Sequence, residues 1–349
     1  MILRSLRQYG FRNLSTPELA FEPGVTAVVG PNAAGKSNLL DACYLASSGD
    51  LPRGRIGDAL RWGLEEGFVA AEVAHTDGTS QVHVGLAAGR KLLRLDGQAV
   101  RRVDLSRVAA AVRITPEDAD LVHGGPSGRR AWMDDLLDRI SPRHAALSRE
   151  YAKLLEQRNA VLRGGGDPAM LDAFSDRLAE VGDEIGRLRQ RMIQRAHDLA
   201  RAAYAEIAGG DKTLGLCLVR AQGELPLRQA LREAAAEERA RGVTVVGPHR
   251  DDLVLALDQR SVHTFGSRGE ARTVALALRV SEYRLLEDKH GEAPILLLDD
   301  FSAELDPDRR RYLLALTERS PQALVSGTEA PPHAASMLRV ADGEVSPRA

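Results

Sequence analysis

The stretch Gly30-Pro31-Asn32-Ala33-Ala34-Gly35-Lys36-Ser37 constrains this chain more than any other feature. It fits the pattern G-x-x-x-x-G-K-[ST], which is typical of phosphate-binding loops. The apolar, β-branched run at 25–29 predicts a buried strand before it, and residues 38–45 predict a helix after it. Backbone N–H groups at such a junction of strand, loop and helix bind phosphate. The sequence therefore predicts a site for ATP or GTP.

Each residue type in this loop has an expected physical role. Gly30 and Gly35 would allow positive φ and close approach of the backbone to phosphate. Lys36 would place its charge on the β- and γ-phosphates, and the hydroxyl of Ser37 would bind Mg²⁺. A glycine-rich turn that matches by chance is the alternative, but the flanking strand and helix favour nucleotide binding. The loop leaves open what hydrolysis would drive.

Composition limits the class of protein to which the loop belongs. The chain has 349 residues, 44% of them hydrophobic and 28% charged, which is typical of a soluble globular protein of two or three domains. No apolar run approaches a membrane span, and the N-terminus lacks the apolar core of a signal peptide. Two distant cysteines, Cys43 and Cys217, predict a reducing, cytoplasmic location without a disulfide or zinc site. The net charge of −2 excludes a uniformly basic nucleic-acid binder.

Hydrophobic patterns predict β-structure early in the chain and helices in its middle. Alternating runs separated by Asp-Gly pairs predict an antiparallel meander over 68–95, followed by a short strand at 112–114. Apolar residues then recur three and four apart over 147–161 and 171–199, which predicts two helices. Because a short glycine-rich loop joins them, these helices would lie antiparallel as an arm, although an ordinary helical bundle fits the same pattern.

The last third of the chain alternates again between strands and helices. We expect strands at 243–246, 253–257, 261–265, 295–298 and 323–326, and helices at 270–289 and 308–319. The expected fold class is α/β. Residues 1–118 and 244–349 would form one discontinuous domain, lobe I, and residues 119–243 would form a helical lobe II with the arm.

Two acidic residues follow the most apolar of these strands. Residues 295–298 read Ile-Leu-Leu-Leu and lead directly into Asp299 and Asp300. Such a run predicts a buried parallel strand that ends at the carboxyl edge of its sheet, where α/β proteins bind ligands. Asp299 would hold Mg²⁺, and Asp300 would be the base that orients the attacking water. Two acids that simply end a strand are the alternative, which the phosphate loop in the same chain disfavours.

Two further motifs lie near this acidic pair. Ser267-Arg268-Gly269 opens a predicted helix about thirty residues earlier, where a hydroxyl and backbone N–H groups can bind an anion. An ordinary N-cap serine is the alternative interpretation. The motif Ser302-Ala303-Glu304-Leu305-Asp306 follows the pair directly, and a turn with Asp306 as N-cap is its alternative.

In combination, these motifs resemble the head of an ABC-type ATPase of the SMC-like branch, and within that branch the RecF family. The stretches that carry the resemblance span nearly the whole chain: Phe11-Arg12-Asn13, residues 30–40, Pro116-Glu117-Asp118, residues 247–252, Ser267-Arg268-Gly269 and residues 298–306. The resemblance implies that residues 30–37 bind ATP, with Arg12, Asn13 and Asn38 as candidates for further nucleotide contacts.

The resemblance also assigns roles beyond the phosphate loop. Ser267, Arg268 and Gly269 would be the signature that reaches the nucleotide of a partner subunit, and Ser302 and Asp306 would belong to the D-loop. The chain departs from the pattern at two places. Glu270 stands where the signature commonly has Gln, and Ser326-Gly327-Thr328 stands where many ABC ATPases carry a switch His. Thr328 is therefore the candidate sensor of the γ-phosphate.

The function that the resemblance implies is recombinational DNA repair and replication restart. An ATP-driven homodimer would form on double-stranded DNA, near single-strand gaps, help to load the recombinase and support the SOS response. Hydrolysis would be slow and stimulated by DNA, RecR and RecO would be partners, and no membrane would be involved. An SMC-like tether is an alternative that the short arm disfavours, and a transporter ATPase subunit is disfavoured because no membrane span is present.

Contacts to DNA would come from local basic side chains near the arm. The candidates are Arg129, Arg130, Arg187, Arg189, Arg191 and Arg195. They would contact phosphates without reading sequence. A solvated helix face is the alternative for each of them. Because aromatic residues make up only 4% of the chain, we expect no platform for stacking unpaired bases.

Overall fold

The computed structural model describes residues 1–348 except 53, 88, 166, 211 and 301–305. The chain forms two compact units. Unit 1 comprises Met1–Asp118, Ala202–Asp211 and Ala275–Ala349, and unit 2 comprises Ala119–Arg201 and Lys212–Val274. The chain is α/β, as its sequence predicts.

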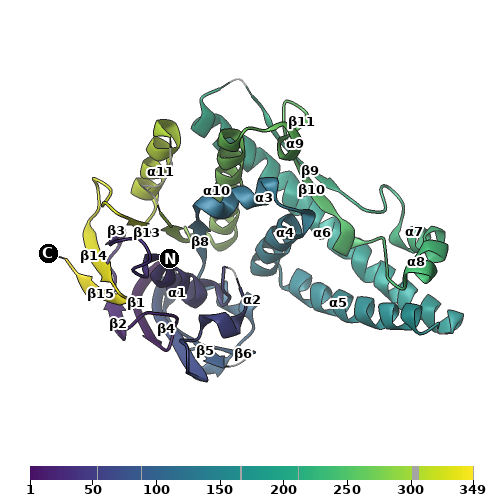
Figure 1. Ribbon diagram of the computed structural model, residues 1–349, viewed down its shortest axis with the longest axis horizontal. Helices are drawn as coiled ribbons and strands as arrows, with labels where there is room; N and C mark the ends of the chain where they lie inside the picture. The colour runs from purple at the N-terminus through teal and green to yellow at the C-terminus, as the bar shows by residue number, and fades with distance from the viewer. Residues whose placement is uncertain (53, 88, 166, 211, 301–305, 349) are drawn as a thin grey trace. The chain divides into compact units, whose positions relative to one another are not determined.

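One of the two sheets of unit 1 is mainly parallel and has the order β15-β14-β3-β13-β12-β8 (Figure 1). Only β15 runs antiparallel to its neighbour. The strands are β3 (Gly24–Val29), β8 (Ala111–Ile114), β12 (Ile295–Leu298), β13 (Gln322–Gly327), β14 (Ser336–Ala341) and β15 (Glu344–Pro347). β3, which leads into the phosphate loop, and β12, which leads into Asp299, are separated by β13.

The second sheet of unit 1 is antiparallel, in the order β2-β1-β4-β5-β6-β7. Its strands are β1 (Ile2–Tyr9), β2 (Glu18–Ala20), β4 (Glu66–His75), β5 (Gly78–Ala87), β6 (Arg90–Leu95) and β7 (Gln98–Ala99). The predicted meander is confirmed by the ladders that join β4, β5 and β6. Every second residue along these strands points into the core from one face of the sheet, as Leu6, Val69 and Val84 do.

Helix α1 (Lys36–Ser48) packs on strands of both sheets. Eleven of its 13 residues are buried, so the helix is covered on all sides and need not be amphipathic. Its apolar residues join one core with residues from both sheets. The other helices that lie wholly in unit 1 are η1 (Ile56–Ala59), α2 (Arg102–Leu105) and α11 (Pro307–Arg319). This packing holds the residues after the phosphate loop against both sheets.

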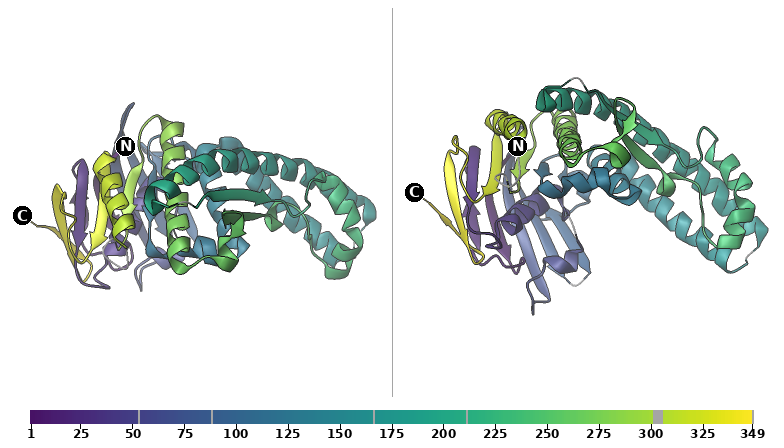
Figure 2. Two further views of the ribbon diagram at one scale, coloured as in Figure 1. Left: turned by 90° about the horizontal axis from the view of Figure 1, so that it is seen from above. Right: turned by 45° about the horizontal axis from the view of Figure 1, so that its top comes forward.

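Unit 2 contains the predicted pair of antiparallel helices. These are α5 (Pro142–Arg163) and α6 (Pro168–Ala208), which lie side by side in Figure 2. They pack through residues such as Tyr151, Leu178 and Ile185. The remaining helices that begin in or near unit 2 are η2 (Pro116–Ala119), α3 (Asp120–His123), α4 (Pro126–Ile140), α7 (Leu227–Glu233), α8 (Ala235–Arg241), η3 (Pro248–Arg250), α9 (Val262–Phe265) and α10 (Arg268–His290). Residues of α6 and α10 belong to both units.

Residues 244–274 lie in unit 2, which corrects the expectation that they belong to lobe I. The reason is a three-stranded sheet in the order β11-β10-β9. Its central strand, β10 (Asp252–Leu257), pairs with β9 (Leu214–Val219) and with β11 (Arg260–Ser261). Hydrogen bonds between segments far apart in the chain therefore decide where unit 2 ends. Local sequence patterns do not reveal such bonds.

Two predicted strands are wrong. Residues 243–246 form no strand. The backbone N–H and the hydroxyl of Thr244 form hydrogen bonds with side chains instead of with another strand. Its N–H donates to Asn159 Oδ1 over 2.8 Å, and its hydroxyl accepts from Arg158 over 2.7 Å. Residues 261–265 form the end of β11 and the short helix α9. Strand β14 beside β3, and β15 at the edge beyond it, were absent from the prediction.

Candidate functional site

The phosphate loop closes on itself through its lysine. Lys36 Nζ donates to the carbonyl oxygens of Gly30 and Pro31 over 2.8 and 2.9 Å, and its side chain is buried. Gly35 caps α1 with φ of 113°, as the glycine at this position was expected to allow. Ala33 also has a positive φ, of 63°. The loop thus holds its cation next to the N-terminus of α1, where anions are favoured.

Gly30 does not have the positive φ that was expected of it. A Cβ at Gly30 would lie 2.2 Å from the carbonyl oxygen of Val340 in β14. The glycine is therefore needed for close approach of the neighbouring strand, which the sequence reading did not contain.

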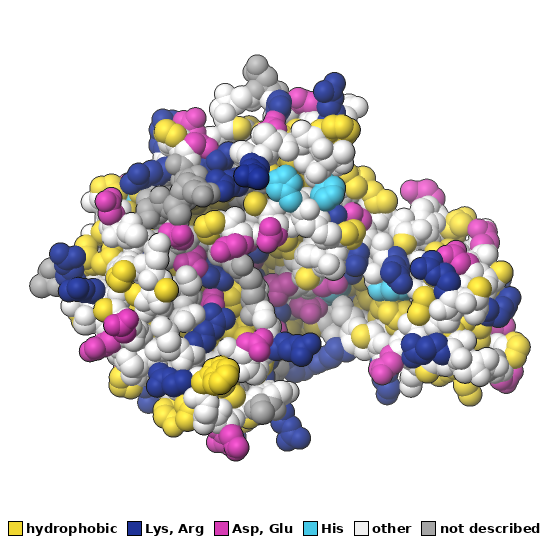
Figure 3. Space-filling view, viewed as in Figure 1, with side chains coloured by type: hydrophobic (Ala, Val, Ile, Leu, Met, Phe, Trp, Pro, Cys, Tyr) yellow, Lys and Arg dark blue, Asp and Glu magenta, His cyan; other side chains and the backbone are white. Residues whose placement is uncertain are grey.

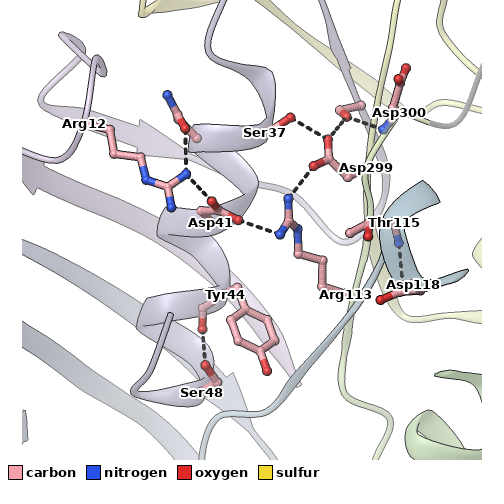
Figure 4. A network of polar contacts seen from close by, with 12 residues as sticks. Arg12, Ser37, Asp41, Tyr44, Ser48, Arg113, Thr115, Asp118, Asp299 and Asp300 are labelled. Atoms are coloured by element: carbon pink, nitrogen blue, oxygen red, sulfur yellow. Dashed lines mark hydrogen bonds and ion pairs between the residues drawn. The ribbon is translucent and has the colours of Figure 1, made fainter. Parts of the chain in front are cut away.

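The side chains expected to hold Mg²⁺ lie together in unit 1. Ser37 Oγ donates to Asp299 Oδ1 over 3.0 Å (Figure 4). The same carboxylate oxygen accepts from Ser326 Oγ over 2.7 Å, and the Asp299 side chain is buried. Hydroxyl and carboxylate oxygens are the hard ligands that Mg²⁺ prefers, and a nucleotide would supply further oxygen ligands. The residues present therefore fit a Mg²⁺ ion bound with ATP.

Asp300 has an unusual backbone conformation. Its φ is 53°, which non-glycine residues rarely adopt. Its N–H donates to Ser326 Oγ over 2.9 Å, so one serine contacts both acidic residues. Strained backbone of this kind concentrates at functional sites. Ser326 lies on β13, between the two strands that lead to Lys36 and Asp299.

A chain of buried ion pairs extends from Asp299 away from the loop. Arg113, on β8, contacts Asp299 through Nη2 and Asp41 Oδ1 through Nη1, the second over 2.9 Å (Figure 4). Asp41 also pairs with Arg12. Burial raises the pKa of Asp41, while Arg113 and Arg12 act in the opposite direction. Arg113 therefore neutralises two carboxylates that would otherwise face each other with little water.

The candidates for further nucleotide contacts also meet. Arg12 Nη1 donates to Asn38 Oδ1 over 2.8 Å, and Asn38 Nδ2 donates to Asn13 Oδ1 over 2.7 Å. A Cβ at Gly35 would lie 3.0 Å from the Asn13 side chain, so Asn13 reaches the phosphate loop itself. The turn after β1 is thereby joined to the start of α1.

Sequence reasoning missed Asp41 and Arg113, and it named Ser326 only at the switch position without giving it a role. Each carried a signal. Asp41 lies four residues after Ser37, hence on the same face of α1. Arg113 and Ser326 are polar residues within strands whose residues are all buried. A polar side chain in a fully buried strand needs a partner, and here the partner is Asp299.

In unit 2, Ser267 is the N-cap of α10 in a reciprocal arrangement with Glu270. The N–H and hydroxyl of Ser267 donate to Glu270 Oε2 over 2.8 and 2.9 Å, and Glu270 N–H donates to Ser267 Oγ over 3.2 Å. This is a capping box. Hydrogen bonding by Lys212 and then by Ser267 lowers the pKa of Glu270 to about 2. Glu270, the residue that departs from the signature pattern, thus holds the hydroxyl of the predicted signature serine.

The remaining motif residues are placed only in part. Ser302 lies outside the described residues. Asp306 is the N-cap of α11 and accepts from the N–H groups of Asp308 and Arg309 over 3.1 and 2.9 Å. Thr328 lines a depression together with Gly30 and Pro31, so it borders the phosphate loop.

Two of the six candidate DNA contacts are corrected by the structure. Arg129 is buried and pairs with Asp252, and Arg189 is buried and pairs with Asp134 and Asp251. Both are structural cations within unit 2, because their guanidinium groups are already satisfied. Arg130 is half-buried and donates to the Asp251 carbonyl over 2.8 Å.

Arg187, Arg191 and Arg195 remain as exposed candidates. They lie four residues apart and so share one face of α6. Arg187 also pairs with Glu184. On the face of the molecule in Figure 3, Lys and Arg side chains are interspersed with Asp and Glu, in keeping with the near-zero net charge.

The described residues contain neither a membrane-spanning helix nor a cluster of metal-binding side chains. No helix among them is long and apolar enough to cross a membrane. Nor do three or more His, Cys, Asp or Glu side chains cluster there as a possible metal site. Mg²⁺ bound with a nucleotide needs only one or two carboxylates, since phosphates supply the other ligands.

Comparison with known proteins gives consistent matches over the whole chain. The family model described as RecF/RecN/SMC N terminal domain matches residues 2–338. The DNA replication and repair protein RecF of Deinococcus radiodurans is 47% identical over 345 residues, covering 99% of this chain and 95% of the relative. The RecF protein of a Synechococcus species is 36% identical, covering 99% and 98%.

Solved structures match as well. The recombination mediator protein RecF in complex with ATP, described as part of the RecFOR pathway, has a TM-score of 0.93 at 28% identity and covers 99% of this chain and 97% of its own. An SMC head domain from Pyrococcus furiosus has a TM-score of 0.56 at 16% identity, covering 99% and 95%, which shows a shared fold.

Proposed function

Because the chain belongs to the RecF family of DNA replication and repair proteins, within the wider group of RecF, RecN and SMC ATPase heads, we propose that it closes into a homodimer around ATP on double-stranded DNA. ATP holds the dimer together, and slow hydrolysis releases it. The observation that carries the proposal is the meeting of Ser37 with Asp299 beside the phosphate loop.

The residues of unit 1 would bind and position the nucleotide. Lys36, which now donates to two carbonyls of its own loop, would turn its charge to the β- and γ-phosphates. Ser37 and Asp299 would hold Mg²⁺, which neutralises phosphate charge when bound. Asp300 would orient the attacking water, and Ser326 would fix both acids. Arg12, Asn13 and Asn38 would contact the nucleotide from the turn after β1.

The other half of the site would come from a second copy of the chain. Ser267, Arg268 and Gly269 begin α10, where backbone N–H groups favour an anion. The Ser267 hydroxyl would exchange its bond to Glu270 for one to the γ-phosphate of the partner's ATP. Ser302 and Asp306 would form the D-loop, and Thr328 would sense the γ-phosphate from the border of the loop. Two such sites would close a two-fold dimer.

Exposed arginines of α6 and the half-buried Arg130 would bind DNA, without base-specific contacts. Arg187, Arg191 and Arg195 form the exposed stripe on α6, and Arg130 lies on α4. Each phosphate contact would weaken with salt. By analogy with the solved RecF relative of the RecFOR pathway, we expect RecR and RecO as partners. The work of the complex would be recombinase loading at single-strand gaps in the cytoplasm, with support of the SOS response.

Light scattering of the full chain tests this function. We expect the mass to double with ATP and Mg²⁺, and blunt duplex DNA to bind only under those conditions. Lys36→Ala should abolish both effects because ATP no longer binds, and Ser267→Ala should abolish dimerisation while ATP still binds. A Ser267→Ala protein that dimerises as wild type would contradict the shared site, and a wild type that neither doubles in mass nor binds duplex would contradict the proposed function.

A further inference from the structure

The outer face of the antiparallel sheet in unit 1 carries a row of aromatic side chains. Side chains alternate across a strand, so the face opposite Leu6, Val69 and Val84 points away from the core. Along this outer face, the ladders align two rows of residues across β1, β4, β5 and β6 (Figures 1 and 2). One row is Tyr9, Phe68, Gly85 and Leu92, and the other is Arg7, Ala70, His83 and Arg94.

Three rings in these rows touch one another. Tyr9 and Phe68 have ring centroids 6.4 Å apart at an interplanar angle of 29°, and Phe68 and His83 have centroids 5.3 Å apart at 22°. The rings are accessible, with Tyr9 55% exposed and Phe68 and His83 half-buried. Leu92, at the far end of the first row, is 46% exposed. We call Tyr9, Phe68 and His83, with their neighbours Arg7 and Arg94, the aromatic face.

Two arginines share the second row with His83. By strand register, Arg94 lies opposite His83, and Arg7 lies one strand further away, beyond Ala70. Burial lowers the pKa of His83, and the charges of Arg94 and Arg7 lower it further. Within the part of the chain that the structure describes, neither Arg7 nor Arg94 makes an ion pair. Glu18 lies opposite Arg7 by strand register, and Glu72 accepts a hydrogen bond from Gln81 over 2.7 Å. Since neither arginine forms an ion pair among these described residues, both can contact phosphates next to the stacked rings.

Acidic residues border the aromatic face and limit its net charge. By strand register, Glu18 lies opposite Arg7, and Glu66 and Glu72 lie on either side of Phe68 along β4. A surface of this kind does not attract duplex DNA through charge alone. Stacking on the rings would instead supply most of the binding energy, because every base has an aromatic face.

Trp62 lies in the loop that precedes β4 and is 100% exposed. The N–H of its neighbour Arg61 donates to the carbonyl of Gly10, the residue after Tyr9, over 2.8 Å. Leu64 also packs at Gly10. The loop that carries Trp62 is thereby anchored at the Tyr9 end of the aromatic row. A fully exposed tryptophan is unusual for a residue whose ring would normally be buried.

We propose that the aromatic face and Trp62 bind unpaired bases of single-stranded DNA, so that the protein recognises the single-stranded side of a gap while other residues hold the duplex. This inference rests on the proposed function and names part of its substrate. It also reverses the expectation drawn from the low aromatic content, because the few aromatic residues gather on one sheet face. Two arginine contacts predict a weak salt dependence, with a slope of about −1.4 in log K against log salt.

Fluorescence anisotropy of labelled DNA tests the proposal with the full chain, ATP and Mg²⁺. The probes are a blunt duplex and the same duplex with an oligo(dT) tail of about 16 nucleotides, the upper site size for one single-strand binding fold. We expect wild type to bind the tailed duplex at least about 5-fold more tightly, the effect of one stacked base. Tyr9→Ser, Phe68→Ser and Trp62→Ser should each reduce that preference and leave affinity for the blunt duplex unchanged.

Two controls keep a folding defect apart from a lost contact. Tyr9→Phe retains the ring and should retain the preference for the tail. Met170→Ser removes a side chain that is 52% exposed elsewhere, on α6, and should change nothing. Trp62 is also an internal reporter, since Trp132, the only other tryptophan, is 6% exposed. In a Trp132→Phe background, oligo(dT) should quench the fluorescence of Trp62.

The outcomes distinguish this inference from the proposed function. Equal affinity of wild type for tailed and blunt duplex, or an unchanged preference in Tyr9→Ser and Phe68→Ser, would overturn the aromatic face as a single-strand site. Either result is compatible with ATP-dependent binding to the blunt duplex. Failure of that duplex binding itself would contradict the proposed function, whatever the tail does.

Discussion

The hydroxyl of Ser37 donates a hydrogen bond to Asp299 Oδ1 over 3.0 Å, although 262 positions separate the two residues in the chain. The contact joins α1, which follows β3 and the phosphate loop, to the end of β12. β3 and β12 are not neighbours in the sheet, because β13 lies between them. Ser326, on the intervening strand, donates to the same oxygen. The site for Mg²⁺ and ATP is therefore assembled around β13 and depends on that strand.

Arg113 should be the most sensitive structural residue near the site. Replacing it by Met leaves the carboxylates of Asp41 and Asp299 buried without their shared cation. Removing one partner of a buried ion pair typically costs about 3–5 kcal/mol. Urea unfolding of Arg113→Met should show a loss of that order in the free energy of unfolding. Arg94→Met, an exposed arginine on β6, should lose less than about 0.5 kcal/mol; equal effects of the two substitutions would contradict the role of Arg113.

Ser326→Ala should separate nucleotide binding from hydrolysis. The substitution removes a donor to Asp299 and leaves the N–H of Asp300 without its acceptor. An unsatisfied buried donor costs about 1–3 kcal/mol, so we expect kcat to fall on the order of 10-fold or more. Titration with a fluorescent ATP analogue should show nearly unchanged affinity, since Lys36 and its loop are intact. An unchanged kcat in Ser326→Ala, with a loss in Thr328→Ala, would place the control of hydrolysis at Thr328 instead.

Glu270→Gln should strengthen ATP-dependent dimerisation. The carboxylate of Glu270 holds the Ser267 hydroxyl and lies where a partner's γ-phosphate is expected. A neutral amide accepts a weaker hydrogen bond and removes one negative charge from that place. We expect the dimer dissociation constant with ATP to fall about 5-fold, or about 1 kcal/mol, measured by sedimentation. Glu287→Gln, an exposed change on the same helix, should have no effect; weaker dimerisation of Glu270→Gln would contradict this account of the signature.

Stability of unit 2 should depend on pH through His249. Tyr151 donates to its Nδ1 over 2.8 Å, and its Nε2 contacts the Thr244 carbonyl over 3.1 Å, which fixes a neutral ring. Burial lowers the pKa of His249 to about 4, from about 6.5 in the unfolded chain. Between these values the unfolded chain binds the extra proton, so the free energy of unfolding falls as pH falls.

The free energy of unfolding should fall by up to about 3 kcal/mol between pH 7 and pH 4 through His249. This effect is isolated by comparing urea unfolding of wild type and His249→Gln across that range, because all other titrating groups are common to both proteins. The variant should be less stable than wild type at pH 7 and the difference should shrink towards pH 4. A difference that does not change with pH would show that His249 does not titrate as its burial requires.

The local motifs were predictable from sequence because each is set by neighbours in the chain. The phosphate loop, the strand before Asp299 and the two arm helices are all defined by spacing within about ten residues. Ser267 was open to two interpretations, an anion-binding signature or an ordinary N-cap. The capping box with Glu270 shows that it is an N-cap in the single chain. Its contact with a partner's nucleotide stays a prediction.

Features that depend on distant segments were not predictable in this way. A glycine is needed at position 30 because Val340 of β14 lies so close. Residues 252–257 belong to unit 2 because they pair with β9. Arg189 illustrates the same limit for charge, since an arginine is usually exposed, whereas contacts with Asp134, Pro248 and Asp251 hold this side chain in a buried place. Predicting the aromatic face would have required the register of four strands, which composition alone does not provide.

A mixing experiment tests most directly whether the ATP site is shared between two copies of the chain. Lys36→Ala lacks the loop cation, and Ser267→Ala lacks the signature hydroxyl, so each protein alone should hydrolyse almost no ATP. A dimer of one with the other contains one intact site, with Lys36 and Ser267 on different chains. Because neither variant is expected to pair with itself, every dimer in an equal mixture should be a mixed one, and the mixture should restore up to about half of wild-type ATPase activity. A mixture that remains as inactive as its two components would contradict the shared site.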